Sequence, residues 1–184
     1  MAIQLEIVTP KGRALQETVD EVRAPSVEGE FGILPGHLPL LAALRTGIVT
    51  YRAGGTEHRV AVGTGFAEVG PARDEQGGET GETKVLVLTD EFTNRESIDP
   101  VVVCKDLAEV QDEIVKLTSK DNAQEGAAAE KTRTLITREN WLAAELELYG
   151  DPPPATMRPY EEFGPSPPDE TAAPEGEGDT QSNA

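Results

Sequence analysis

Two histidines and a single cysteine are the side chains best suited to acid–base, nucleophilic or metal chemistry, and their surroundings support none of it. His37 could form an acid–base pair with Glu30, but neither a nucleophile nor a third group accompanies the pair. His58 lies in a polar, strand-like stretch, where we expect it to be exposed. Cys104 follows three valines, so we expect a small buried side chain rather than a nucleophile. The sequence predicts no catalytic residue, no metal site and no cofactor.

Glycines do not indicate a nucleotide site either. Gly63-Thr64-Gly65 is too short to be a phosphate-binding loop, and no lysine follows it at the required spacing. Close packing of strands explains these two glycines better.

Charge excludes further classes of partner. Asp and Glu number 34 against 16 Lys and Arg, a net charge of −18. Nucleic acids and anionic lipid surfaces both select clustered positive charge, so neither is an expected partner. No apolar run approaches the roughly 20 residues that span a bilayer. The first residues alternate like a strand and lack the features of a signal peptide, so we expect the chain to stay in the cytoplasm.

Residues 1–90 have the pattern of a β-sandwich. Ile3, Leu5 and Ile7 alternate with polar residues, and a turn follows at Thr9–Gly12. Further strand-like runs are Val19–Val22, Gly47–Tyr51, Arg59–Val62, Phe66–Val69 and Lys84–Leu88. Frequent Gly and Pro between the runs predict about ten short strands. We expect the polar stretch Pro71–Thr83 to be a long mobile loop; a partner-contacting loop is the alternative.

Residues 91–150 have a helical pattern instead. One apolar face consists of Leu107, Val110, Ile114 and Leu117, and a second consists of Leu135, Leu142, Leu146 and Tyr149. Asp99 and Pro100 fit the start of the first helix, residues 119–126 break the pattern, and Gly150 with three prolines ends the second. Each face is narrow, so we expect the hairpin to pack on another surface. The predicted fold class is α+β.

Residues 151–184 contain eight prolines, eight acids and one arginine. Such a segment buries too little apolar surface to offset the entropy of ordering, so we expect a disordered acidic tail. Tyr160 and Phe163 could instead form a short recognition motif.

The segment Glu28–Leu44 is unlike the rest of the β region. It combines three glycines and two prolines with a set of apolar residues. Glycine permits positive φ and proline fixes φ, so the combination predicts a rigid loop that presents a surface.

This segment, beginning Glu28-Gly29-Glu30-Phe31-Gly32-Ile33-Leu34-Pro35-Gly36-His37 and followed by Pro39-Leu40-Leu41, resembles the signature of the epsilon subunits of bacterial F-type ATP synthases. Other family-like motifs occur in the same order. They are Ile7-Val8-Thr9-Pro10, Val19-Asp20-Glu21-Val22, Gly47-Ile48-Val49, Val62–Val69, Val87-Leu88-Thr89-Asp90 and Ile98-Asp99. The resemblance covers residues 1 to about 100.

The resemblance implies a sandwich followed by two helices, in a non-catalytic rotor subunit that couples proton flow to ATP synthesis. Expected partners are the gamma subunit, the ring of c subunits and the beta subunit. The expected ring contacts are Glu30, Phe31, Gly32, Pro35, Gly36 and His37; a turn histidine bonded to backbone is the alternative for His37. The chain is then expected at the cytoplasmic face of the bacterial cell membrane, as a peripheral protein.

In the family, the helical hairpin can extend along gamma and hinder ATP hydrolysis. Lys131, Arg133 and Arg138 are the residues expected to contact the beta subunit in that state. Relatives that bind ATP carry an arginine where this chain has Val102, so we expect no ATP binding. The alternative is a β-sandwich interaction module with a helical oligomerisation arm, unconnected with ATP synthesis.

Overall fold

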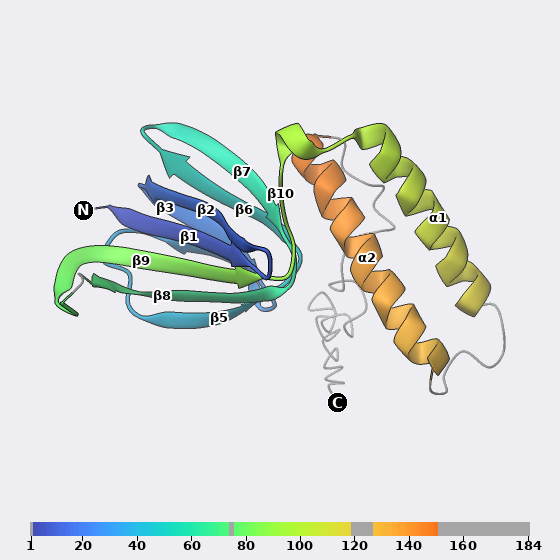
Figure 1. The fold of residues 1–184 in the computed structure, drawn as a ribbon, viewed down its shortest axis with the longest axis horizontal. Coiled ribbons are helices and arrows are strands. Elements are labelled where there is room, and N and C mark those ends of the chain that lie inside the picture. Colours follow the sequence, from blue (N-terminus) through green and yellow to red (C-terminus); the bar gives the residue numbers. More distant parts are fainter. Residues whose placement is uncertain (1, 74–75, 119–126, 151–184) are drawn as a thin grey trace, which may run out of the picture.

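A computed structural model describes residues 2–73, 76–118 and 127–150. It confirms the predicted class: a β-sandwich is followed by two helices, which lie side by side at one end of the sandwich (Figure 1). The expected break at 119–126 and the expected tail at 151–184 lie outside the described residues.

Ten strands form the sandwich. They are β1 (Ile3–Thr9), β2 (Gly12–Val19), β3 (Glu21–Ser26), β4 (Gly29–Ile33), β5 (Leu40–Leu44), β6 (Gly47–Ala53), β7 (Thr56–Val62), β8 (Gly65–Arg73), β9 (Glu79–Thr89) and β10 (Phe92–Asn94). One layer has the order β10-β7-β6-β3 with β4 beside β3, and the other has the order β5-β8-β9-β1-β2. A single pair, Ser26 with Leu44, joins the layers through β3 and β5. Only β1 and β9 pair in parallel; the other ladders in the described chain are antiparallel.

The core lies between the two layers and is almost entirely aliphatic. Alternation along each strand supplies it, as with Ile3, Leu5 and Ile7 on β1, all fully buried. Val85 and Val87 on β9 and Val49 on β6 are fully buried as well. The sandwich is therefore held by burial of apolar surface, at roughly 25 cal/mol per Å².

Three expectations about the β region were wrong in part. Val19–Val22 is not one strand, because Asp20 separates β2 from β3. The segment 28–44 is not one loop: β4 and β5 occupy most of it and leave only residues 34–39 between them. Pro71–Thr83 is mainly strand, because β8 and β9 extend into it and pair Pro71 with Thr83 and Arg73 with Glu79.

The hairpin consists of α1 (Pro100–Thr118) and α2 (Ala127–Tyr149), preceded by a short 3₁₀ turn, η1 (Arg95–Ser97). Asp99 caps α1 as expected: its Oδ1 accepts hydrogen bonds from the backbone N–H of Val101 at 3.0 Å and of Val102 at 3.4 Å. At the end of α2, Gly150 has φ 107° and donates its N–H to the carbonyl of Leu146 at 3.1 Å.

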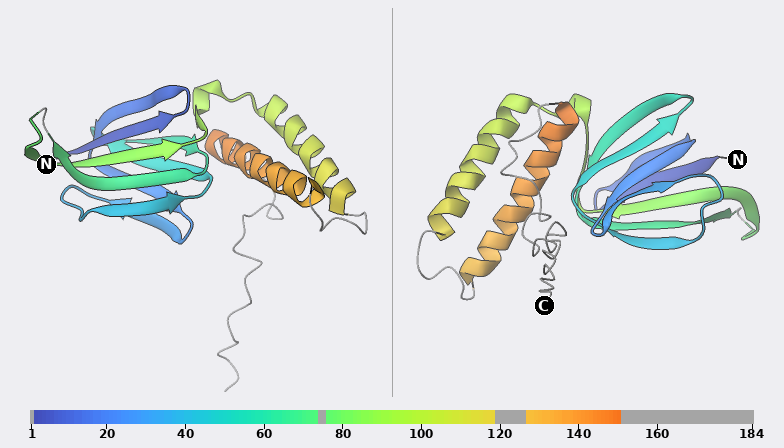
Figure 2. Two further views of the ribbon diagram at one scale, coloured as in Figure 1. Left: turned by 60° about the horizontal axis from the view of Figure 1, so that its bottom comes forward. Right: turned by 180° about the vertical axis from the view of Figure 1, so that it is seen from behind.

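Helix α2 lies between the sandwich and α1 (Figures 1 and 2). A second apolar cluster forms there, in which Trp141, Leu142 and Leu146 of α2 pack with Leu107 of α1 and Ala61 on the outer face of β7. The expectation that the hairpin packs on another surface is confirmed, and that surface is the chain's own sandwich.

Two helical side chains differ from expectation. Cys104 is exposed, because the helical turn that buries Val103 rotates the next position outward. Tyr149 is 37% exposed at the end of α2, whereas Leu142 and Leu146 of the same predicted helical face are buried. No helix among the described residues is long and apolar enough to cross a membrane.

Candidate functional site

The outer face of the layer β5-β8-β9-β1 presents apolar side chains to solvent. Leu41 is 70% exposed, Phe66 55% and Leu88 46%. They come from three neighbouring strands: Ala43 on β5 pairs with Phe66 on β8, and Phe66 pairs with Leu88 on β9. We call Leu41, Phe66, Leu86 and Leu88 the apolar face. Glu68, which pairs with Leu41 on β5 and with Leu86 on β9, is exposed among these side chains. Exposed apolar side chains grouped on neighbouring strands make this face a candidate contact surface for another protein.

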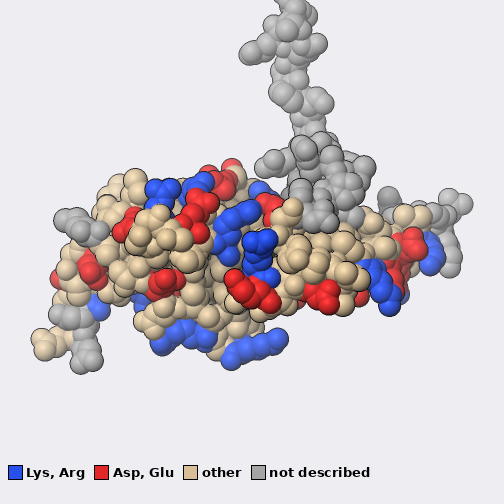
Figure 3. Space-filling model, turned by 90° about the horizontal axis from the view of Figure 1, so that it is seen from above, with Lys and Arg blue, Asp and Glu red and all other residues tan. Residues whose placement is uncertain are grey.

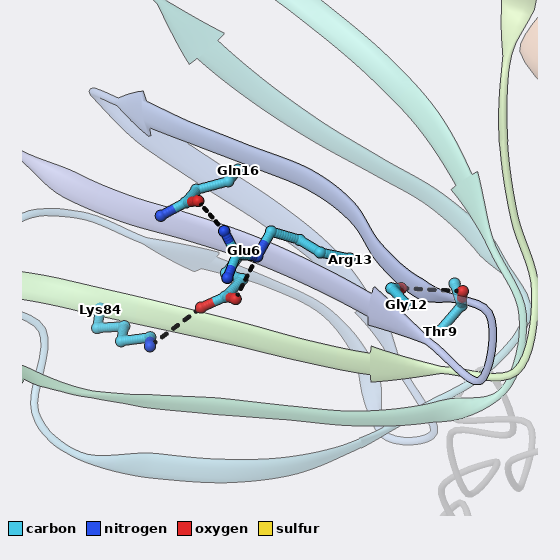
Figure 4. A network of polar contacts seen from close by, with 6 residues as sticks. All are labelled: Glu6, Thr9, Gly12, Arg13, Gln16 and Lys84. Carbon is cyan, nitrogen blue, oxygen red and sulfur yellow. Dashed lines mark hydrogen bonds and ion pairs between the residues drawn. The ribbon is translucent and has the colours of Figure 1, made fainter.

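A polar network borders the apolar face on β1 and β2 (Figure 4). The Glu6 carboxylate lies 3.0 Å from Nε of Arg13 and 3.1 Å from Nζ of Lys84, and Arg13 also donates to Oε1 of Gln16 at 2.5 Å. The ammonium of Lys84 is the main cause that lowers the pKa of Glu6, which stays ionised. An apolar centre with a charged rim is the usual anatomy of a protein–protein interface.

The other layer already has its outer face partly covered. Ile48 and Ala61, paired across β6 and β7, face α2 and belong to its apolar cluster. The hairpin thus covers part of one outer face of the sandwich, over β6 and β7, and no described element packs extensively on the apolar face of the other layer.

The six residues expected to contact the ring fall into two groups. Glu30, Phe31 and Gly32 lie on β4, which pairs only with β3 among the described strands. The Phe31 ring packs partly against the core. Pro35, Gly36 and His37 lie in the turn after β4. The expectation of one continuous rigid loop must therefore be corrected to a strand followed by a turn.

The turn after β4 is fixed by hydrogen bonds. The backbone N–H of His37 donates to the carbonyl of Leu34 at 3.0 Å, and that of Gly36 donates to Oγ1 of Thr83 at 2.8 Å. Gly36 has φ 85°, which favours glycine. Nδ1 of His37 lies 2.7 Å from the carbonyl of Leu38, the backbone contact that the alternative for this residue anticipated.

The three basic residues of α2 are not equivalent. Nζ of Lys131 lies 2.6 Å from Glu113, and Nη2 of Arg138 lies 3.6 Å from Asp106, both on α1. Arg133 is exposed and makes no ion pair within the described part of the chain. In this arrangement Lys131 and Arg138 form exposed ion pairs between the two helices, whose main contact is the apolar cluster.

The structure does not bring together the residues considered for acid–base, nucleophilic or metal chemistry. His58 is exposed, as expected, and its ring stacks on that of Tyr51 at 5.2 Å. Gly63 and Gly65 are explained by packing: a Cβ on Gly63 would meet the Asp90 carboxylate, and one on Gly65 would meet the carbonyl of Leu88. No group of three His, Cys, Asp or Glu side chains in the described ranges is arranged to hold a metal ion.

Sequence reasoning missed the apolar face. The signal was present in Val85-Leu86-Val87-Leu88, where apolar residues occupy both faces of β9 rather than alternating. Apolar residues on both faces of a strand indicate a second surface that could be buried by packing.

Comparison with known proteins gives concordant matches. The family described as ATP synthase, Delta/Epsilon chain, beta-sandwich domain matches residues 2–73. The ATP synthase epsilon chain of Anaeromyxobacter dehalogenans strain 2CP-C is 40% identical over 133 residues, which cover 72% of this chain and 90% of that one. The ATP synthase epsilon chain of Nitratidesulfovibrio vulgaris strain Miyazaki F is 46% identical over 98 residues, covering 53% and 65%.

The fold also resembles a chain in the mitochondrial ATP synthase of Euglena gracilis, solved with its F1 head and c-ring. The TM-score is 0.57 at 24% identity, and the match covers 79% of this chain and 81% of that one. At this identity the likeness concerns the fold alone.

Proposed function

Because the chain belongs to the family of ATP synthase epsilon chains, it is a rotor subunit of the F-type ATP synthase, and we propose that it acts by binding its neighbours without catalysing a step. It would couple proton flow through the ring to ATP synthesis in the head by transmitting rotation. A stiff sandwich suits that role, because a subunit that carries torque must not deform.

The observation that carries this proposal is the uncovered apolar face. We assign it to the gamma subunit. Phe66 and Leu88 lie side by side near its centre and are about half exposed in the isolated chain. Burying one large apolar side chain contributes roughly 1.5–3 kcal/mol, so a few such residues support a stable contact. The charges of Arg13, Lys84 and Glu6 at the rim would fix its orientation.

Ring contact is proposed for β4 and the turn after it. The Leu34–His37 turn lies near the N-terminal end of the sandwich, because Gly36 bonds to Thr83 and Thr83 in turn donates to the carbonyl of Ala2 at 3.3 Å. The helices stand at the opposite end (Figure 1). One end of the sandwich is thus available to the ring while the other carries the hairpin, and the chain would sit at the cytoplasmic face of the membrane through this contact.

Inhibition of ATP hydrolysis is proposed for the hairpin in a second, extended state. Contact with the beta subunit would then involve Arg133, which is exposed, and Lys131 and Arg138, whose ion pairs with α1 would have to open first. The docked arrangement seen here is the other state of that equilibrium.

Replacing Phe66 by Asp in the full chain tests the gamma assignment. A charge at the centre of the buried face should weaken binding to the isolated gamma subunit by more than tenfold, or about 1.4 kcal/mol. Val101→Asp is the matched control: Val101 is 77% exposed in the first turn of α1, where an acid is tolerated. Equal binding of both variants and the unaltered chain would refute the assignment. Self-association lost in Phe66→Asp would favour the interaction-module alternative.

A further inference from the structure

Helix α1 has an exposed face opposite the side that packs on α2. Its buried residues Val103 and Leu107 belong to the apolar cluster shared with α2. On the other side of the helix, every third or fourth residue returns to one face, because an α-helix turns by about 100° per residue. That face carries five exposed residues, which we call the α1 seam: Val101, Lys105, Ala108, Asp112 and Val115.

The α1 seam lies on the outside of the hairpin. Among the described elements, α1 packs extensively only on α2, which lies between α1 and the sandwich (Figures 1 and 2). Val101 is 77% exposed and Val115 is 60% exposed. These two apolar side chains lie at the two ends of the seam, about 21 Å apart along the helix axis. A partner of the seam must therefore be elongated and must offer apolar groups at the same spacing.

The order of side chains along the α1 seam is complementary to its own reverse. From one end to the other it reads apolar, basic, small, acidic and apolar. If a second copy is turned end to end about Ala108, its Val115 lies opposite Val101 and its Asp112 lies opposite Lys105. A copy in the parallel direction would instead place Lys105 beside Lys105 and Asp112 beside Asp112. The charges therefore match an antiparallel second copy and oppose a parallel one.

The total charge of the chain does not favour self-association, so the local pattern must supply it. The net charge is −18. On the face shown in Figure 3, Lys and Arg side chains lie among Asp and Glu side chains over both the sandwich and the helices. The α1 seam has one base and one acid, so two seams meet without bringing net charge together. Lys105 also lies 3.7 Å from Glu109 of its own helix, an exposed pair that contributes little.

We propose that two copies of the chain associate through their α1 seams, antiparallel about a two-fold axis at Ala108. The small side chain of Ala108 lets the two helices approach closely where they cross. The contact uses the same surface of both copies and therefore closes at a dimer. It is smaller than the roughly 1,200 Å² of stable complexes, so the dimer is weak and forms at about 10 µM to 1 mM protein. The contact involves no other subunit and does not depend on the proposed function.

Reversal of the seam charges tests the pairing in the full chain. Lys105→Glu places an acid opposite Asp112 of the second copy and should weaken association by about tenfold or more in sedimentation equilibrium. Adding Asp112→Lys restores an opposite pair and should recover the association. The Lys105–Glu109 ion pair is lost in both variants, so its loss cannot explain a recovery. Circular dichroism checks that each variant retains its helices.

Cysteine trapping tests the direction of the two helices. In a Cys104→Ser background, Ala108→Cys should form a disulfide-linked dimer under mild oxidation with copper phenanthroline, because the two-fold axis brings both positions together. Val102→Cys is the matched control: Val102 is 52% exposed but lies off the seam, and should not link. In the unaltered chain the two Cys104 residues would lie about 12 Å apart along the helix axis. A disulfide requires Cα atoms within about 7 Å, so Cys104 should not link either.

Four results would overturn the proposal. They are a chain that stays monomeric up to about 1 mM, equal association of Lys105→Glu and the unaltered chain, no recovery in the double variant, and efficient linking through Cys104, which indicates parallel helices. Phe66→Asp should retain the self-association, because Phe66 lies on the sandwich and not on α1. Loss of self-association in that variant would place the contact on the apolar face and overturn the proposal as well. Failure of Phe66→Asp to weaken gamma binding would concern the proposed function alone.

Discussion

At the scale of single residues, close packing at Gly65 is the most restrictive feature of the sandwich. A side chain there would enter the carbonyl of Leu88 on the paired strand. Gly70, on the same strand, has open space at the corresponding position. The sequence predicts close strand packing at Gly65, and the structure confirms it there and shows open space at Gly70.

Gly65→Ala should lower the free energy of unfolding by about 1–3 kcal/mol, because β8 and β9 must separate locally to admit the methyl group. Gly70→Ala, the matched control, should change it by less than about 1 kcal/mol. Denaturant titration followed by circular dichroism measures both. Equal stability of the two variants would contradict the packing account.

Residue-level prediction succeeded where a local rule decides the outcome. Asp99 was recognisable as a cap because it precedes Pro100 at the start of a periodic run. Cys104 was misjudged because its three valine neighbours suggested burial, although the helical period decides which of them faces inward. For His37, the sequence offered both a partner contact and a backbone contact, and the structure shows the second without testing the first.

At the scale of elements, two carboxyl groups, Glu91 and Glu145, are partly buried where α2 meets the sandwich, and burial destabilises their charged forms. Desolvation is the largest cause that raises the pKa of both Glu91 and Glu145. Repulsion from Glu91 and Asp106 raises the pKa of Glu145 further, whereas Arg138 and a hydrogen bond from the Trp141 indole lower it. Repulsion from Asp90 raises the pKa of Glu91, and the charges of Arg138 and Lys11 lower it. Docking of α2 therefore favours the protonated acids.

The sign of the pH dependence follows from this. In the docked structure both pKa values lie above the ordinary value of 4.5. If undocking exposes these groups and returns them to that value, their contribution to docking is fully present below it and is lost as the pH rises through the raised pKa values. Undocking should increase from mildly acidic to neutral pH. Quenching of the single tryptophan, Trp141, which is 5% exposed in the docked state, measures it.

Glu145→Gln should flatten that pH dependence and reduce quenching at neutral pH, because the amide can still accept from Trp141 without carrying a charge. Glu130→Gln, on an exposed position of α2, is the matched control and should leave the profile unchanged. The same slope in Glu145→Gln as in the unaltered chain would show that this carboxylate does not control docking.

Element existence was predictable from periodicity, whereas element length was not. The polar stretch around Pro71 looked like a loop because the ends of β8 and β9 bury few side chains, yet backbone pairing continues to Arg73 and Glu79. The apolar stripe of α2 was visible in the sequence, but its partner surface, Ile48 and Ala61, reads simply as part of two strands. Contacts between distant elements have no local signal.

At the scale of the whole molecule, the sandwich divides its surface among different tasks. The hairpin covers part of one outer face, over β6 and β7. The apolar face is exposed on the other layer, and the turn after β4 lies at the end away from the helices. A rotor subunit that contacts several neighbours at once requires such a division. The family was recognisable from ordered motifs, but the placement of these surfaces required the fold.

Affinity purification of the tagged full chain from detergent-solubilised native membranes, with mass spectrometry of the bound proteins, tests the central claim most directly. The account predicts recovery of gamma, the alpha and beta subunits of the head and the c subunit of the ring, and a reduced recovery of gamma in Phe66→Asp. Recovery of none of them by a folded chain would contradict it.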